Sequence, residues 1–202
     1  QDAIDAANSL DIVLVQPGTY QENINFRGKN LTLGSLFLTT GKRSYIEETI
    51  IDGGGRKEVA MLQNIESYAR FSGLTLTNGE NVAYLGAAIF CAGEFDLILD
   101  HVILTENAGS AVKHEGGKLL IQNSQIRRNM GGVSAVSFDG LSDSNITILN
   151  SLIVENNQYA IYTTGNSELL VSFSTISQNG NQPQNSVSGL DLGGTSHIFE
   201  NS

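Results

Sequence analysis

The chain has 202 residues, of which 40% are hydrophobic, and it carries a formal net charge of −10. This acidic balance argues against binding to nucleic acid, because phosphate backbones attract clustered lysines and arginines. No apolar run reaches the roughly 18 residues that predict a membrane-spanning helix. The single cysteine, Cys91, excludes an internal disulfide. A chain of this length fits one domain.

The first segment, residues 1–8, is predicted to be a short helix. Ile4 and the neighbouring alanines form a small apolar face, and Asp2 and Asp5 suit the positive N-terminal end of a helix dipole. A stack of repeated coils needs a cap that covers its first apolar layer and its unpaired strand edge. We expect this helix to be that cap, with the coils occupying residues 12–202.

Short strands follow the helix and are separated by turns. Apolar runs predict strands at residues 12–15, 24–26, 31–33 and 49–51. Residues 36–48 do not continue this pattern, and we expect them to form an excursion from the coil. After the excursion, strand-like and turn-like segments alternate through the rest of the chain.

One pattern occurs three times between residues 109 and 179. Each copy ends in an asparagine, and these asparagines (Asn129, Asn156 and Asn179) lie 27 and 23 residues apart. Apolar and polar residues alternate within each copy, as they do in half-buried strands. Repeats of about 20–30 residues are typical of solenoids. These copies are too short, and too rich in Asn, Ser and Gly, for pairs of helices.

The strands of the repeat lack the short turns that would join them into hairpins. Each strand must therefore pair with its equivalent in the next copy, in parallel and in register. The sequence predicts an all-β protein, a single-stranded parallel β-helix with a short N-terminal capping helix, as one domain over residues 1–202. The chain stops in the middle of a coil at Ser202, so we expect further coils, C-terminal domains or a partner there.

Stacking of equivalent residues predicts the interior of the coil. Two inner columns are expected: Val112, Val136, Ile161 and Leu190 in one, and Ile126, Ile153 and Ile176 in the other. A further series should form a ladder in which each side-chain amide bonds to the next: Asn107, Asn129, Asn156 and Asn179. Asparagine also tolerates the left-handed backbone of a tight corner. We interpret this series as structural, with ligand binding as the alternative.

The opening of the chain carries a resemblance to known proteins. The residues concerned are Ala3-Ile4-Asp5-Ala6-Ala7, Asp11-Ile12-Val13-Leu14-Val15, Pro17-Gly18-Thr19-Tyr20 with Glu22-Asn23-Ile24, and Lys29-Asn30-Leu31-Thr32-Leu33. With the central repeats, they resemble right-handed parallel β-helix repeat proteins of the pectate-lyase-like superfamily. The resemblance implies a right-handed coil and an extracellular or cell-surface location in a bacterium. Relatives cleave acidic polysaccharides, so a polysaccharide is an expected partner.

The motifs of the catalytic relatives are incomplete. Leu99-Asp100-His101-Val102 resembles part of a pectate lyase motif, but the chain has no tryptophan and lacks the downstream Arg-x-Pro-x-x-Arg pattern. We interpret Asp100 and His101 as corner residues. A hydrolase of this fold needs two neighbouring carboxylates as its acid and base, and the sequence contains no adjacent Asp-Asp pair. No cluster has zinc-ligand spacing, so no metal site or cofactor is predicted, although calcium at a corner stays an alternative.

One coil holds a group of basic residues in this acidic chain: Lys113, His114, Lys118, Arg127 and Arg128. A lyase needs a basic residue to remove a proton and positive charge to hold a uronate carboxylate. Candidate catalytic residues are therefore Lys113, Arg127 and Arg128. The alternative, which we favour, is a charged face balanced by neighbouring glutamates.

A strip of outward-facing residues is the expected binding surface. Phe90, Lys113, Ser137, Tyr162 and Asp191 should follow one another at steps of about 4.8 Å, where aromatic and polar groups can track a sugar chain. Carbohydrate-binding candidates are Phe90, Lys113, Tyr162 and Asp191, and an ordinary solvent face is the alternative. We expect a secreted or cell-surface, non-catalytic module that serves as a scaffold or binds carbohydrate. A polysaccharide lyase and an end-to-end self-assembling module are the alternative functions.

Overall fold

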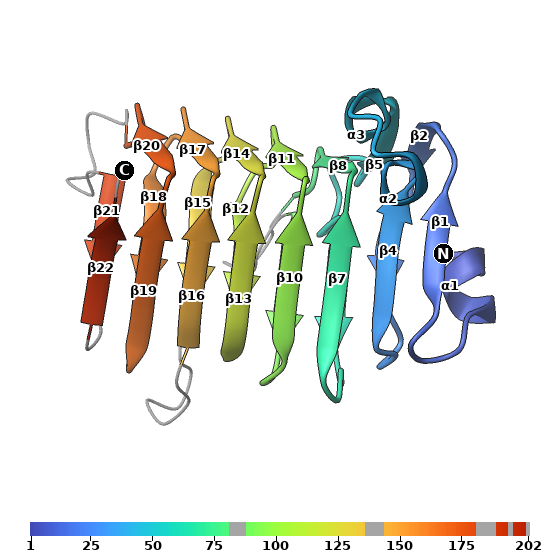
Figure 1. The fold of residues 1–202 in the computed structure, drawn as a ribbon, viewed down its shortest axis with the longest axis horizontal. Helices are drawn as coiled ribbons and strands as arrows, with labels where there is room; N and C mark the ends of the chain where they lie inside the picture. The colour runs from blue at the N-terminus through green and yellow to red at the C-terminus, as the bar shows by residue number, and fades with distance from the viewer. Residues whose placement is uncertain (81–87, 136–143, 181–188, 194–195, 201–202) are drawn as a thin grey trace.

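The computed structural model describes residues 1–80, 88–135, 144–180, 189–193 and 196–200. In these residues, three parallel sheets run along the length of an elongated coil (Figure 1). Each turn of the coil contributes one strand to each sheet, so neighbouring strands in a sheet come from successive turns. The predicted parallel β-helix is confirmed.

Sheet A faces the viewer in Figure 1. Its strands are β1 (Ile12–Val15), β4 (Leu31–Ser35), β7 (Tyr68–Ser72), β10 (Asp96–Asp100), β13 (Gly117–Gln122), β16 (Ser144–Leu149), β19 (Ser167–Ser172) and β22 (Ser196–Glu200). Sheet B consists of β2 (Gly18–Gln21), β5 (Thr49–Asp52), β8 (Thr75–Thr77), β11 (Ile103–Thr105), β14 (Gln125–Arg127), β17 (Leu152–Val154) and β20 (Thr175–Ser177). Sheet C consists of β3 (Ile24–Asn25), β6 (Ala60–Gln63), β9 (Ile89–Ala92), β12 (Ser110–His114), β15 (Gly131–Ala135), β18 (Tyr159–Thr163) and β21 (Gly189–Leu192).

The N-terminal helix is present but shorter than predicted. Helix α1 covers Asp2–Ala6, and Ala7 is already extended, with φ −69° and ψ 153°. The backbone N–H of Asn8 donates to Asp11 Oδ2 at 2.7 Å, and such a side-chain contact competes with helix continuation. Within α1, Ile4 is buried against the first coil. The helix thus covers part of the open end, as Figure 1 shows.

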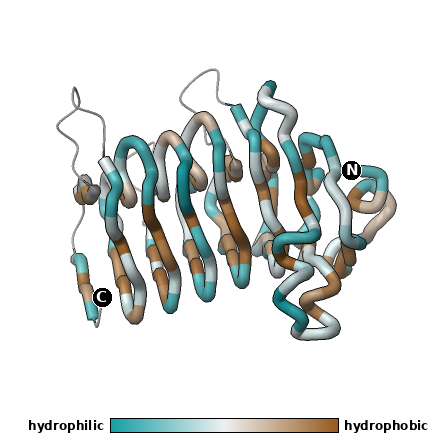
Figure 2. The backbone as a smooth tube through the Cα atoms, turned by 90° about the horizontal axis from the view of Figure 1, so that it is seen from above, coloured by the Kyte–Doolittle hydropathy of each residue, from teal (hydrophilic) through white to brown (hydrophobic). Residues whose placement is uncertain are grey.

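The predicted excursion after β4 folds into two short helices, α2 (Phe37–Thr40) and α3 (Ser44–Glu48). Two contacts attach it to the coil. The side chain of Ser35 donates to the Gly73 carbonyl oxygen, and the hydroxyl of Thr75 donates to the Ile46 carbonyl oxygen at 2.8 Å. Figure 2 shows this excursion projecting from the otherwise regular stack.

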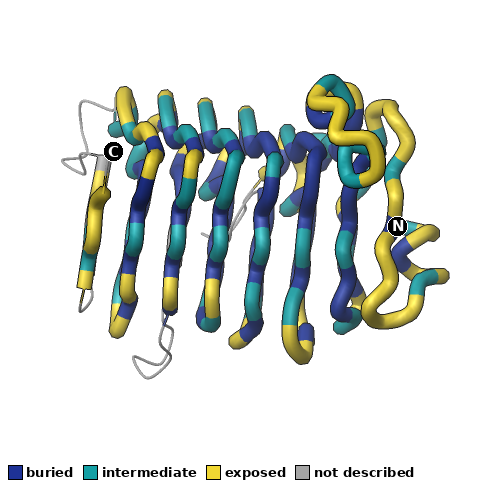
Figure 3. The backbone as a smooth tube through the Cα atoms, in the orientation of Figure 1, coloured by how far each residue is buried: buried dark blue, intermediate teal, exposed yellow. Residues whose placement is uncertain are grey.

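The core is a narrow column of apolar side chains inside the coil (Figures 2 and 3). The inner column of sheet B is as predicted, because Ile126 pairs with Ile153 and Ile153 with Ile176. Full burial of each aliphatic side chain contributes about 1.5–3 kcal/mol. No single coil encloses its own apolar face, so this stabilisation comes from contacts between neighbouring coils.

The predicted inner column of sheet C has the wrong residue at one position, and its last member, Leu190, pairs with Ile161 as predicted but is 39% exposed. Val112 pairs with Val133, and Val133 pairs with Ile161, so Val133 takes the place expected for Val136. Strand β15 begins at Gly131, where an added Cβ would lie 2.8 Å from the Tyr159 ring. The glycines therefore mark the point where coils approach closely, and the additional residues of this repeat follow the strand. Val136 itself lies outside the described residues.

Buried asparagine amides link four successive coils. The side-chain N–H of each asparagine donates to the side-chain oxygen of the next: Asn107 to Asn129 at 2.8 Å, Asn129 to Asn156 at 3.0 Å, and Asn156 to Asn179 at 2.9 Å. Those same oxygens also accept the backbone N–H of the preceding asparagine. The predicted amide-to-amide bonds are therefore present, and they occupy groups that a ligand would need.

Replacing Asn156 by alanine tests how much this series stabilises the coil. The change leaves the backbone N–H of buried Asn129 without its acceptor, whereas the Asn129 side-chain amide keeps the Leu104 and Arg127 carbonyl oxygens as acceptors. An unsatisfied buried donor costs about 1–3 kcal/mol. We expect the free energy of unfolding, measured in urea, to fall by about 1–3 kcal/mol. Asn157→Ala, at an exposed neighbouring position, should change it little, and equal effects of the two variants would contradict the assignment.

A second prediction concerns His114, which points into the core and is fully buried. Its Nε2 lies 3.1 Å from the Phe95 carbonyl oxygen, and its Nδ1 has no hydrogen-bond partner. Burial is the main cause that lowers the pKa of His114 from 6.5 to about 4. Above pH 6.5 the imidazole is neutral in both states, whereas below it the unfolded chain binds a proton that the folded chain does not.

Stability is therefore expected to fall by about 3 kcal/mol as the pH drops from 6.5 to 4 because of this one residue. The His114→Leu variant lacks the group, so its urea-unfolding free energy should depend less steeply on pH by that amount. The variant also lacks the hydrogen bond to the Phe95 carbonyl oxygen. That loss lowers the unfolding free energy by the same amount at every pH, so it does not affect the slope of the unfolding free energy against pH. Identical slopes for the two proteins would refute the prediction.

Candidate functional site

The corner between sheets A and B carries one outward-pointing residue per coil. These residues directly follow the strands of sheet A and have left-handed backbones, with φ between 46° and 69°: Gly73, His101, Asn123, Asn150 and Phe173. Asparagine and glycine adopt this conformation readily, whereas histidine and phenylalanine do so at a cost. The corner therefore aligns a histidine, two amides and an aromatic ring in one row along the coil axis.

A polar cleft opens beside this row, with a volume of about 310 Å³. We call it the corner cleft, and its lining residues are Arg43, Asn123, Ser124, Gln125, Asn150, Ser151, Leu152, Phe173 and Thr175. Arg43 comes from the excursion and is exposed, while the other residues come from three successive coils. The excursion thus supplies one wall, and the stacked corners and sheet B supply the floor.

Hydrogen bonds hold the corner row in place. Asp100 Oδ2 accepts from Arg70 at 2.9 Å, and Asp100 Oδ1 lies 2.7 Å from His101 Nδ1. The Asn123 amide donates to Asp100 Oδ1 at 3.1 Å and accepts from the Asn150 amide at 2.8 Å. Burial on its own raises the pKa of the Asp100 carboxyl, but hydrogen bonds from Asn123 and His101 outweigh it and lower that pKa.

A column of serines supports the floor of the cleft, and the sequence analysis missed it. Each hydroxyl oxygen accepts a backbone N–H from the preceding coil at 3.1 Å: Ser124 from Val102, Ser151 from Ser124, and Ser174 from Ser151. The signal was in the sequence, because each of these serines directly follows a corner residue. The column keeps the backbone at the base of the cleft in a fixed position.

The two ends of the row carry aromatic rings. At one end the Phe37 ring of the excursion packs on the His101 ring, with centroids 4.5 Å apart. An added Cβ on Gly73 would lie 2.6 Å from Phe37, so a glycine at this corner makes room for the excursion. At the other end Phe173 exposes 67% of its surface. The Phe173 ring is therefore open to contact from outside the coil.

The predicted basic group is not brought together. Lys113 lies on sheet C, Lys118 on sheet A and Arg127 on sheet B, while His114 points into the core. These residues occupy different strands of one coil, and a coil with three sheets sends each strand to a different face. Proximity in the sequence therefore did not predict proximity in space.

The three candidate catalytic residues differ in the groups that surround them. Lys113 is 7% exposed, with its Nζ 3.6 Å from Glu115 and 5.4 Å from the Phe90 ring centre. Burial is the main cause that raises the pKa of Glu115, and Lys113 opposes it. Arg128 lies between two glutamates, Glu106 at 3.7 Å and Glu155 at 3.2 Å. The Nε of Arg127 is buried without a hydrogen-bond partner.

The predicted carbohydrate-binding strip is a register column on sheet C, with one correction. Phe90 pairs with Lys113, Lys113 with Ser134, Ser134 with Tyr162 and Tyr162 with Asp191. Ser134 takes the place predicted for Ser137, for the same reason that Val133 replaces Val136, and Ser137 lies outside the described residues. Phe90 and Lys113 are each only 7% exposed. Tyr162 is partly exposed and packs against Tyr159.

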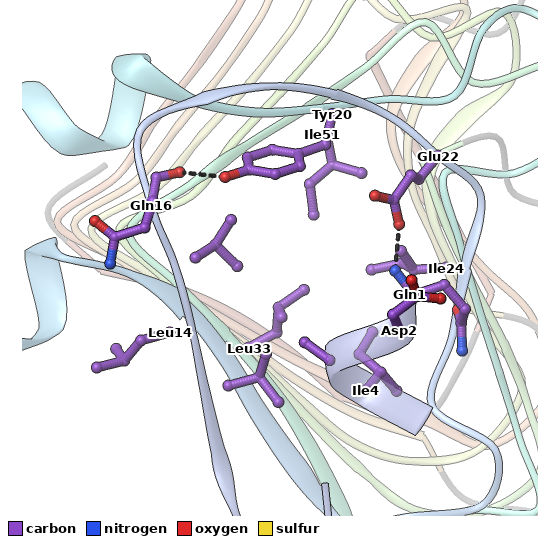
Figure 4. A pocket seen from close by; sticks show the side chains of 13 residues that line it. Gln1, Asp2, Ile4, Leu14, Gln16, Tyr20, Glu22, Ile24, Leu33 and Ile51 are labelled. Atoms are coloured by element: carbon purple, nitrogen blue, oxygen red, sulfur yellow. Dashed lines mark hydrogen bonds and ion pairs between the residues drawn. The ribbon is translucent and has the colours of Figure 1, made fainter. Parts of the chain in front are cut away.

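A larger cavity of about 560 Å³ lies at the N-terminal end of the core beneath α1 (Figure 4). Its lining is mainly apolar, from inward-facing residues such as Val13, Leu33 and Ile51. Tyr20 lies across one side, with its hydroxyl donating to the Gln16 carbonyl oxygen at 3.0 Å. This cavity continues the apolar column of the coil and lacks the row of hydrogen-bonding groups found in the corner cleft.

Within the described ranges, no group of three or more His, Cys, Asp or Glu side chains is arranged to hold a metal ion. The only cysteine, Cys91, is buried, and burial raises the pKa of its thiol. None of the helices in the described residues is long and apolar enough to cross a membrane.

Comparison with known proteins gives one match. A family model described as "Right handed beta helix region" matches residues 22–202. No curated protein and no solved structure matches the chain. The match extends over most of the sequence and agrees with the three stacked parallel sheets, so this chain belongs to the right-handed β-helix family.

Proposed function

We propose that this protein is a non-catalytic carbohydrate-binding module and that the corner cleft is its binding site. The observation that carries the proposal is the row of exposed Phe173, exposed Asn150 and half-buried Asn123 beside Arg43. Carbohydrates present both apolar ring faces and hydroxyl groups. An aromatic ring, the exposed Asn150 amide and a guanidinium meet both of these chemical demands.

The spacing of the row favours an extended glycan over a small molecule. Equivalent residues of neighbouring coils lie about 4.8 Å apart along the axis. Asn123, Asn150 and Phe173 belong to three successive coils, so the cleft offers a regular series of contacts in one direction. A linear chain of sugars that runs parallel to the axis meets one coil after another.

The cleft is also held in its binding shape before any ligand arrives. The Asp100–Asn123–Asn150 hydrogen bonds orient the amides, and the serine column fixes the backbone beneath them. The left-handed corners direct their side chains outward. A preorganised site loses little conformational entropy on binding, which favours affinity.

A bacterial cell surface or the extracellular space is the setting we propose, and there a stack of coils also serves as a scaffold. The resemblance to secreted and surface β-helix proteins supports this location. The acidic composition of the chain, with its net charge of −10, suits neutral glycans better than polyanions. Arg43 is the one charged residue among the described residues that line the cleft.

The lyase alternative has weaker support. A lyase needs a base and a carboxylate-binding group close to one sugar. Lys113, Arg127 and Arg128 lie on different faces of the coil or in ion pairs. No described feature gathers them around a cleft. The functional test must nevertheless include a search for unsaturated sugar products.

Binding to a glycan array, followed by calorimetry on the glycans retained, tests the proposal. Phe173→Ala removes the exposed ring and should weaken binding about tenfold, since stacking on an aromatic ring contributes about 0.5–1.5 kcal/mol beyond its buried area. Asn150→Ala should weaken it by a similar factor through the lost amide. Both variants change exposed corner positions, and their folding is checked by thermal melting.

Tyr162→Ala is the matched control, because it removes an aromatic ring from sheet C, away from the cleft. It should leave binding unchanged. Loss of binding with Tyr162→Ala but not with Phe173→Ala would overturn the corner cleft in favour of the sheet C strip. Absorbance from unsaturated uronates in the same mixtures would contradict the non-catalytic assignment, and failure to bind any glycan would contradict the proposal as a whole.

A further inference from the structure

The outer face of sheet A is unusually apolar for a solvent-facing surface. Alternation along each strand places one residue per coil in a central outward column: Ile98, Leu120, Thr147, Leu170 and Ile198. The neighbours Leu97 and Leu99 on β10 are buried and face the core, which fixes the direction of Ile98. Figure 3 shows this alternation along the strands of sheet A.

This column is accessible from outside the coil. Ile198 is 49% exposed, and Ile98, Leu120 and Leu170 are partly exposed. Sheets with one solvated face normally alternate apolar residues inside with polar residues outside. In Figure 1 the excursion stands near the end of β4 and does not cover the middle of β10 to β22. Contiguous exposed aliphatic residues of this kind mark interaction surfaces.

A charged column runs beside the apolar one. Lys118, Asn145 and Glu168 are register partners on β13, β16 and β19, and all three are exposed. In the described part of the chain, neither Lys118 nor Glu168 makes an ion pair. The two opposite charges thus lie one coil to either side of a neutral amide.

The apolar column is symmetric about β16, and the charged column carries opposite charges at the two equivalent positions. On either side of Thr147 the apolar column reads Leu120 and Leu170, then Ile98 and Ile198. A two-fold axis along β16, lying between two facing copies of sheet A, reverses the order of the coils and keeps the strand direction. That rotation places Lys118 of each copy opposite Glu168 of the other, and Leu120 opposite Leu170.

We propose that this face is a homodimer interface, with a second copy of this chain as its partner and the two-fold axis along β16. An isologous contact requires a self-complementary surface. The apolar column supplies the contact area, and the Lys118–Glu168 pairs, formed twice, supply the register and reject other alignments.

The interface is modest in size. Four strand spacings of about 4.8 Å and a strand length of about 17 Å define the overlapping face. Their product is about 330 Å² on each copy, which is well below the roughly 800 Å² per partner of a standard specific protein–protein interface. We therefore expect a weak dimer whose population rises with protein concentration across the micromolar range.

Charge reversal at the two paired positions tests the geometry. Lys118→Glu places glutamate opposite Glu168, and Glu168→Lys places lysine opposite Lys118, so either change alone should weaken dimerisation about tenfold or more. The double variant Lys118→Glu/Glu168→Lys recreates opposite pairs and should return the dissociation constant to near that of the parent. Sedimentation equilibrium over a concentration series measures all four proteins.

Matched controls carry the same charge changes on other faces. Lys57→Glu and Glu47→Lys alter exposed residues outside sheet A and should leave the dimer unchanged. A parent protein that stays monomeric throughout the series would overturn the proposal. So would a dimer that the single reversals do not weaken, or that the double variant fails to restore. Thermal melting of each variant confirms that its fold is retained.

Discussion

In-register pairing between successive coils is the constraint on which the structure depends. Once each strand hydrogen-bonds to its equivalent one coil away, every position of the repeat becomes a column. Buried columns must then satisfy themselves internally, as Asn129 and Asn156 do through their amides. Exposed columns become linear surfaces, and the corner row of the cleft and the outer face of sheet A are two of these. In such a fold, the residues of one surface come from equivalent positions in successive coils and are not neighbours in the sequence.

Much of the fold could be predicted because the repeat is visible as alternation and as a recurring asparagine. The register around Val133 could not, because the extra residues of that repeat fit equally well before or after the strand in a pattern of apolar residues. What decides the placement is the close approach of Tyr159 to Gly131, a contact between coils. The periodicity of apolar residues does not show on which side of the strand the extra residues lie, whereas the backbone pairing between coils does.

The candidate site was harder to predict than the fold. His101 and Asp100 were correctly placed at a corner, but their partners Asn123, Asn150 and Phe173 are separated from them by whole repeats. The left-handed backbone unites the row, and it is shared by residue types with no chemical resemblance. The basic group shows the converse error: Lys113 and Arg127 are close in the sequence and lie on different sheets. In a solenoid, side chains that lie close together in space are expected at sequence positions one repeat apart.

The two proposals are linked by the geometry of the coil. A two-fold axis along β16 keeps the strand direction of sheet A, and the corner row follows the ends of those strands. In the proposed dimer, the two corner clefts therefore lie at the same edge and open beside one another. Weak binding at each cleft then gains from the presence of the other, because a glycan held by one copy stays at high local concentration near the second. Dimerisation through an apolar sheet face is thus a physical route by which two shallow polar clefts, one on each copy, can together retain a long polysaccharide.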